Sequence, residues 1–211
     1  MINRDELFLF FSELDKQLSE KYPNIKIDIF LLGGTYFVLE ELRPSSLDID
    51  ILLLDAASYR IVLEVAESVK KKYFSLLLDR GLETKYTLSD FSFDILFGVQ
   101  LGEIFLPKNF SNMAKQYRRS RSSFTCIKLW TLSPYDILIS KLFRNQEKDA
   151  RDIALLMDSG HFRFRKKILE RRMEAFQMNS YQRVLLKRNY SMFLQKFEDK
   201  LFSSLWQRFR I

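Results

Sequence analysis

The sequence has little cysteine, histidine, glycine or proline, and each shortage excludes a class of protein or site. The one cysteine, Cys126, excludes a disulfide framework within the chain and a cysteine-rich metal site. The one histidine, His161, cannot form a zinc site by itself. Six glycines and four prolines among 211 residues predict long regular elements joined by few loops.

The sequence also lacks any apolar run that approaches the roughly 18 residues of a membrane span. Its first residues, MINRDELFLFFSEL, carry acidic side chains where a secretory signal would be basic. With 47% hydrophobic and 29% charged residues, the chain is expected to bury a real core. We therefore expect a soluble, cytoplasmic protein that has no membrane partner and keeps its thiol reduced.

Positive charge is abundant but unevenly distributed along the chain. The formal net charge is +7, and residues 161–211 hold 13 Lys/Arg against 4 Asp/Glu, a balance of +9. Residues 1–160 are therefore slightly acidic. Such an asymmetry favours an acidic partner, of which nucleic acid is the commonest, although a solvated helical face gives the same pattern.

The apolar periodicity changes from mixed to purely helical at about two-thirds of the chain. Apolar residues recur with a helical period over residues 5–22, 35–42, 58–73 and 106–121. Runs typical of strands occupy residues 25–32, 47–54, 74–80, 83–90, 91–98 and 122–132. From Ser133 onward every predicted element is a helix. We therefore predict an α+β domain over residues 1–132, followed by a helical domain with basic C-terminal helices over residues 133–211.

Two carboxylates interrupt an otherwise apolar strand in the segment LDIDILLL, residues 47–54. Because side chains alternate along a strand, Asp48 and Asp50 point to the same side of it. Two neighbouring acids repel each other, and a divalent cation with a preference for oxygen ligands removes that repulsion. Asp94, a single acid in FSFDILFG, is a candidate third ligand. A strand end that faces water is the alternative for the Asp48–Asp50 pair alone.

A glycine pair lies at the predicted junction between a strand and a short helix. Gly33 and Gly34 leave the backbone amides uncovered, and Thr35 adds a hydroxyl. Exposed amides at the start of a helix are suited to binding phosphate. A plain turn is the alternative reading of two adjacent glycines, and the acid pair that follows is what favours a phosphate site.

Residues 31–53 resemble the signature of the polymerase-β-type nucleotidyltransferase superfamily. In this sequence the signature consists of an apolar run, Gly33-Gly34, a spacer of 13 residues and the acid pair on a strand. The later FDI, residues 93–95, is similar to the segment that carries the superfamily's third acid. The resemblance implies a mixed sheet flanked by helices and a metal-dependent transfer of a nucleotide from an NTP with release of pyrophosphate. It implies that Mg²⁺ or Mn²⁺ binds to Asp48, Asp50 and Asp94, and that the triphosphate is held by Gly33, Gly34 and Thr35.

A second segment, LSPYDILISKLFRNQEKDARDIALLM, resembles the part that follows the sheet in minimal nucleotidyltransferase toxins of the AbiEii/MenT type. The resemblance implies that Lys141 contacts the triphosphate and that Asp149 acts in catalysis as a base or an orienting group. Arg144 and Asp152 are carried over as further nucleotide-binding residues. From the residues alone, Lys148 and Asp152 could equally form a surface ion pair one helical turn apart.

These features together predict a metal-dependent nucleotidyltransferase that moves an NMP from an NTP to an acceptor hydroxyl. The basic C-terminal helices favour RNA, such as the end of a tRNA, as the acceptor. The resemblance to toxins suggests a toxin–antitoxin or abortive-infection system, with an antitoxin protein as a partner. Two alternatives remain open: transfer to a small molecule or a protein, and a non-catalytic module of the same fold that binds RNA or a partner.

Overall fold

The chain divides into two compact units in the computed structural model, which describes residues 2–79, 92–117, 124–160 and 162–208. The first unit comprises Met1–Gln100 and Lys108–Ser133, and the second comprises Leu101–Pro107 and Pro134–Ile211. The division between Ser133 and Pro134 lies close to the predicted boundary at residue 132. That each part folds as an independent domain stays a prediction.

The first unit is built on a mixed five-stranded sheet, which confirms the predicted α+β fold class. The strands follow the order β3-β2-β1-β7-β6, with β1 antiparallel to β2 and parallel to β7. Strand β2 is parallel to β3, and β6 is antiparallel to β7. The strand bounds are Ile27–Leu31 for β1, Asp48–Leu53 for β2, Ser92–Phe97 for β3, Lys115–Gln116 for β6 and Ile127–Thr131 for β7.

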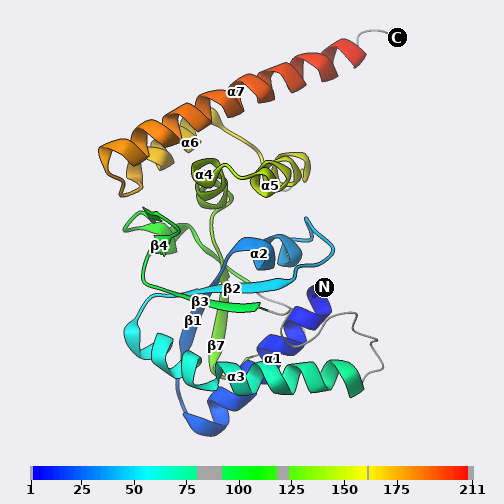
Figure 1. Cartoon of the computed structure of the whole chain (residues 1–211), viewed down its shortest axis with the longest axis vertical. Helices are drawn as coiled ribbons and strands as arrows, with labels where there is room; N and C mark the ends of the chain where they lie inside the picture. The colour runs from blue at the N-terminus through cyan, green and yellow to red at the C-terminus, as the bar shows by residue number, and fades with distance from the viewer. Residues whose placement is uncertain (1, 80–91, 118–123, 161, 209–211) are drawn as a thin grey trace. The chain divides into compact units, whose positions relative to one another are not determined.

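One face of this sheet carries the hydrophobic core, and the two helices α1 (Arg4–Lys21) and α3 (Ala56–Asp79) lie against it (Figure 1). Alternation along β2 directs Ile49, Ile51 and Leu53 into this core, where each is fully buried. The residues between them, which include the acid pair, therefore belong to the opposite face. The short helix α2 (Gly33–Leu39) connects β1 to the loop before β2.

Helix α1 is fixed to the sheet by one carboxylate. Asp15 accepts hydrogen bonds from the backbone N–H groups of Thr125, Cys126 and Ile127, at 2.7, 2.6 and 2.9 Å. The carboxylate thereby satisfies donors at the start of β7 that would otherwise be buried without partners. Cys126 is itself buried, and burial raises the pKa of its thiol.

The strand predicted over residues 74–80 is wrong for the part that the structure describes, because α3 continues to Asp79. The buried side chains of α3 recur at helical spacing, as Val62, Val65, Val69, Tyr73 and Leu77. The apolar run FSLLL extends this stripe. The segment therefore continues the helix, although its composition alone is typical of a strand. The strand predicted over residues 83–90 lies outside the described residues.

The helix predicted over residues 106–121 is also wrong for residues 106–117, the part of it that the structure describes. The segment forms a single 3₁₀ turn, η2 (Phe110–Met113), and then the short strand β6. Lys115 and Gln116 are paired with Thr131 and Trp130 of β7, so the edge of the sheet determines the backbone here. Phe110 is buried, and its ring contacts that of Phe30 at a centroid distance of 5.2 Å.

In its described residues, the second unit contains four helices and a small hairpin that the sequence did not predict. Its helices are α4 (Pro134–Arg144), α5 (Glu147–Asp158), α6 (Lys166–Ala175) and α7 (Ser180–Arg208), and its hairpin pairs β4 (Gln100–Leu101) with β5 (Ile104–Phe105). Among the described residues, no helix is both long enough and apolar enough to cross a bilayer.

A buried ion pair joins α6 to α4 within the second unit. Arg172 donates from Nε and Nη2 to the two carboxylate oxygens of Asp136, at 2.6 and 2.8 Å. Burial raises the pKa of Asp136, and the Arg172 guanidinium opposes that rise. Asn189 of α7 donates to the carbonyl of Leu142 at 2.9 Å and so joins a third helix to α4.

Candidate functional site

The predicted acids of the first unit lie in register on two neighbouring strands. Asp50 of β2 is directly opposite Asp94 of β3, and Asp48 is opposite Ser92. Asp48 and Asp94 are exposed, whereas Asp50 is half-buried. Ser92 donates from its hydroxyl to Asp94 at 2.5 Å. Parallel in-register pairing places all three carboxylates on the face of the sheet that does not carry the core.

The oxygen atoms of these carboxylates are suitable ligands for a divalent cation. Carboxylate oxygens are hard ligands, and Mg²⁺ is commonly held by one or two of them together with substrate phosphates. Within the described ranges, however, no three acidic, histidine or cysteine side chains are grouped closely enough to form a complete metal site. The predicted three-carboxylate site for Asp48, Asp50 and Asp94 therefore stays a prediction, and phosphate oxygens would have to complete it.

The glycine pair packs against the acid strand so closely that a side chain would not fit. A Cβ on Gly33 would lie 1.9 Å from Oδ2 of Asp50, and Gly33 also has a φ of +48°, a conformation that favours glycine. A Cβ on Gly34 would lie 2.1 Å from the hydroxyl oxygen of Ser46. No pattern in the sequence pointed to Ser46, because this contact depends on how closely the turn approaches the start of β2.

Thr35 ties the glycine turn to the backbone of β2. Its hydroxyl accepts a hydrogen bond from the N–H of Asp50 at 2.9 Å and donates to the carbonyl of Asp48 at 3.4 Å. Thr35 is fully buried, and its helix, α2, begins at Gly33 rather than at the predicted position 35. In this structure the hydroxyl therefore orders the acid strand, and its predicted contact with phosphate stays a prediction.

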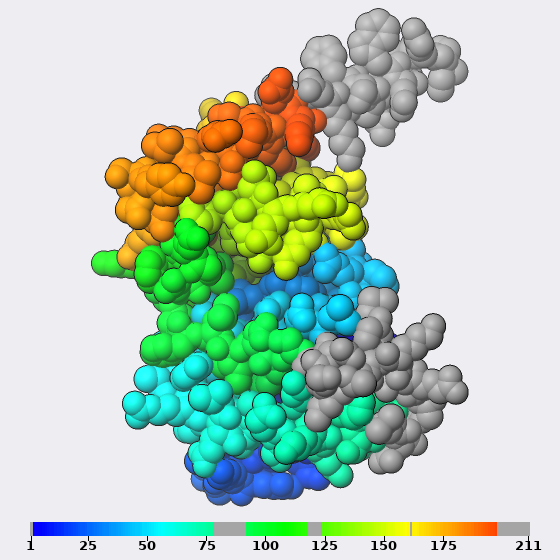
Figure 2. All heavy atoms as spheres, viewed as in Figure 1, coloured from blue at the N-terminus to red at the C-terminus, as the bar shows by residue number. Residues whose placement is uncertain are grey.

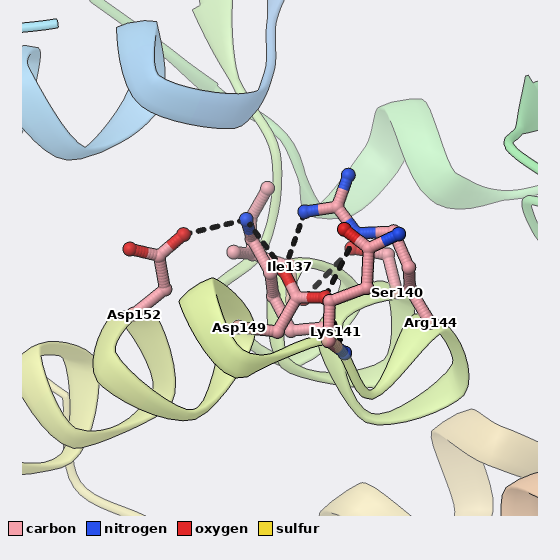
Figure 3. A network of polar contacts seen from close by, with 7 residues as sticks. Ile137, Ser140, Lys141, Arg144, Asp149 and Asp152 are labelled. Carbon is pink, nitrogen blue, oxygen red and sulfur yellow. Dashed lines mark hydrogen bonds and ion pairs between the residues drawn. The ribbon is translucent and has the colours of Figure 1, made fainter.

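The second group of predicted residues lies on α4 and α5 of the second unit and forms a charge network (Figure 3). The Nζ of Lys141 lies 2.6 Å from Oδ2 of Asp152 and 3.2 Å from Oδ1 of Asp149. Arg144 donates from Nε to Asp149 at 2.8 Å and contacts the same carboxylate through Nη2. Asp152 is thus a buried partner of Lys141, and Lys148 is exposed.

The electrostatics of this network favour an ionised Asp149. Burial raises the pKa of Asp149, but hydrogen bonds from Arg144 and the Gln146 backbone, together with Lys141, outweigh burial and lower it. The N–H of Gln146 donates to the carboxylate at 3.0 Å. A carboxylate held by two cations is a weak base. Of the two predicted roles for Asp149, orientation therefore suits this arrangement better than proton abstraction.

Replacement of Thr35 tests whether its hydroxyl orders the acid strand. In Thr35→Val the N–H of Asp50 loses its acceptor, and we expect a loss of about 1–3 kcal/mol in the free energy of unfolding. The amide hydrogen of Asp50 should also exchange faster. Thr35→Ser keeps the hydroxyl and should keep the protection of that amide. Equal protection of the Asp50 amide in Thr35→Val and wild type would show that the hydroxyl is not its acceptor in solution.

Replacement of Asp149 tests the charge network, with Glu147 in the same first turn of α5 as the matched control. Asp149→Asn leaves Lys141 buried with one partner fewer, and we expect about 3 kcal/mol of destabilisation in urea unfolding at pH 7. Glu147→Gln, which alters an exposed pair with Arg151, should change stability by less than about 0.5 kcal/mol.

The pH dependence of that difference follows from the lowered pKa of Asp149. A carboxyl whose pKa is lower in the folded state contributes fully above its ordinary value of 3.8 and loses this contribution as the pH falls through the lowered pKa. The stability gap between wild type and Asp149→Asn should therefore be constant from pH 7 to pH 5 and shrink only below 3.8. A gap that shrinks above pH 5 would contradict the assignment.

A comparison with known families covers both groups of residues. Residues 5–199 match one family model, which is described as a nucleotidyltransferase of unknown function (DUF6036). No curated protein and no solved structure matches the chain. The match supports the nucleotidyltransferase superfamily, and the closer resemblance to AbiEii/MenT toxins stays a prediction. Because the model spans far more than half of the 211 residues, the chain belongs to the DUF6036 family of nucleotidyltransferases of unknown function.

Proposed function

We propose that this protein transfers a nucleotide from an NTP to an acceptor hydroxyl in a metal-dependent reaction. The observation that carries the proposal is the register that sets Asp50 opposite Asp94, with the Gly33 turn packed against the Asp50 carboxylate. Family membership supports the same reaction class. Acids on one face of the sheet, next to a glycine turn, are the groups that this chemistry needs.

The residues of the first unit would act on the donor nucleotide. Asp48, Asp50 and Asp94 would hold Mg²⁺ or Mn²⁺, and Gly33 and Gly34 would leave their backbone amides open to the triphosphate. When bound, the metal would acidify the attacking hydroxyl and stabilise the charge that develops on the pyrophosphate. The acceptor oxygen would bond to the α-phosphorus as the bond from that phosphorus to the bridging oxygen breaks.

The charge network of the second unit would contribute to the same reaction. Lys141 and Arg144 would bind the triphosphate, Asp152 would be a further nucleotide-binding residue through its contact with Lys141, and Asp149 would orient the acceptor. In this structure the two cations and two carboxylates neutralise each other. A triphosphate would therefore compete with the carboxylates for the Lys141 ammonium.

The helices α6 and α7 favour RNA as the acceptor. Of the described side chains in residues 162–197, those of nine Lys/Arg are exposed, whereas Glu174 is the one exposed acid. The side chains of α7 that are described form part of the surface in Figure 2. The exposed cations are Arg163, Arg165, Lys166, Lys167, Arg171, Arg183, Lys187, Arg188 and Lys196.

An acceptor such as a tRNA end would place the protein in the cytoplasm. The resemblance of residues 132–157 to AbiEii/MenT toxins makes the protein a candidate toxin of a toxin–antitoxin or abortive-infection system, with an antitoxin as its partner. Its cationic face would supply the phosphate contacts that hold RNA without regard to sequence.

A labelling assay tests the transferase. The protein is incubated with each α-labelled NTP, Mg²⁺ and total RNA, and label is then sought in RNA, protein and small molecules. Asp50→Asn and Asp94→Asn should each lower the rate about a hundredfold or more, because a metal site supplies several kcal/mol of transition-state stabilisation. Asp28→Asn, an exposed acid on β1, should retain activity.

The destination of the label separates the remaining alternatives. Label in a small molecule or in protein would keep the transferase and reject RNA as acceptor. Absence of label from all three fractions, with Asp50→Asn indistinguishable from wild type, would reject the transferase and favour a non-catalytic binding module.

A charge variant of α7 tests the proposed RNA contact. Arg183 and Lys187 are exposed and lie one helical turn apart. Arg183→Gln with Lys187→Gln should weaken binding of labelled RNA and reduce the slope of log Kd against log salt by about 1 to 2. Lys71→Gln with Lys72→Gln, an exposed pair on α3, serves as the control. An unchanged slope in the α7 variant would remove this helix from the RNA site.

A further inference from the structure

We infer that Arg43 is a phosphate-binding residue of the nucleotide site in the first unit. Arg43 lies in the loop between α2 and β2 and is half-buried. No sequence motif pointed to it, and the predicted cations for the triphosphate, Lys141 and Arg144, both belong to the second unit. The inference rests on the proposed nucleotidyl transfer and adds a residue that contacts the substrate.

The position of Arg43 is determined by α2 through both its backbone and its side chain. Its backbone N–H donates to the carbonyl of Phe37 at 3.1 Å, and its guanidinium carbon lies 5.6 Å from the centroid of the Phe37 ring. Phe37 is fully buried and therefore gives the guanidinium a rigid surface. The planar donor group is thus held in place before any ligand binds.

The guanidinium reaches the glycine turn. Nη1 of Arg43 lies 3.7 Å from the position that a Cβ on Gly34 would occupy. On the preceding residue, the Cβ position of Gly33 is instead filled by the carboxylate of Asp50. The Asp50 carboxylate therefore lies next to Gly33, and on the Gly34 side the Arg43 guanidinium lies just beyond the nearer Ser46 hydroxyl.

This arrangement matches the charge distribution of a metal-bound triphosphate. The carboxylates would repel phosphate and attract the cation that accompanies it, whereas a guanidinium donates charge-assisted hydrogen bonds to phosphate oxygens, often two at once. Hydrogen bonds between charged groups contribute about 1.5–3 kcal/mol, which corresponds to roughly tenfold or more in affinity. Arg43 should therefore distinguish nucleotides by their number of phosphates.

Calorimetry of the full chain with Mg²⁺ and each NTP, and with the matching NMP, tests the inference. Arg43→Gln removes the charge and keeps much of the side-chain stem. We expect it to weaken NTP binding about tenfold or more and NMP binding by less than about threefold. Arg43→Lys keeps the charge and should give an intermediate loss for the NTP. Arg60→Gln, an exposed arginine on α3 in the same unit, should bind as wild type does.

The outcomes separate this inference from the proposed function. Failure of the wild type to bind any NTP would reject the proposed function, and the inference with it. Wild-type binding with an unchanged NTP affinity in Arg43→Gln would overturn the inference alone. An equal loss for NTP and NMP would also overturn it, because that result indicates a packing role on Phe37. If Arg43→Gln fails to fold, the same comparison is made with Arg43→Lys, for which an unchanged ratio of NTP to NMP affinity overturns the inference.

Discussion

The contact between Gly33 and the carboxylate of Asp50 is the constraint on which the candidate site depends. A Cβ at Gly33 would meet that carboxylate at 1.9 Å, and the residue has a φ of +48°, so this approach without displacement of the carboxylate favours glycine. Two hydrogen bonds reinforce the approach: the N–H of Leu32 donates to the carbonyl of Asp50 at 3.0 Å, and Thr35 accepts from the Asp50 N–H. The turn and the acid pair therefore form one structural unit, and a shift of either moves the other.

The two groups of charged residues differ in how their charge is compensated. Asp149 and Asp152 are buried beside Lys141 and have the cations they need within the protein. Asp48 at the start of β2 and Asp94 on β3 are instead exposed, and water screens their charge. Buried ion networks of this kind set geometry, whereas exposed carboxylates remain accessible to a ligand. We therefore propose that the acids of the sheet, rather than the buried network, are the primary ligand-binding groups.

The sequence predicted an element correctly where its pattern of apolar residues agrees with the tertiary contacts of that segment. The prediction was wrong where distant contacts override the local pattern. The alternation in β2 predicted that Ile49 and Ile51 would lie in the core, opposite the acids, and both are fully buried. It could not predict that residues 115–116 pair with β7, because strand pairing depends on a partner distant in the chain. The role of Thr35 was not foreseen for a related reason. The Thr35 hydroxyl donates to the carbonyl of Asp48, 13 residues away, and accepts from the N–H of Asp50, 15 residues away.

The two substrates of the proposed reaction, the donor nucleotide and the acceptor, would bind to different parts of the protein. The two proposals depend on different observations. We propose that the glycine turn, the acids and Arg43, all in the first unit, bind the donor nucleotide, with Lys141 and Arg144 as further contacts of its triphosphate. The RNA acceptor is assigned to exposed cations of α6 and α7, in the second. A Cβ at Gly33 or Gly34 would clash with Asp50 or Ser46, so the turn favours glycine, whereas exposed cations on helices accept many partners. Proof that an NTP binds would therefore support the reaction class without identifying the acceptor, and only the destination of the nucleotide can do so.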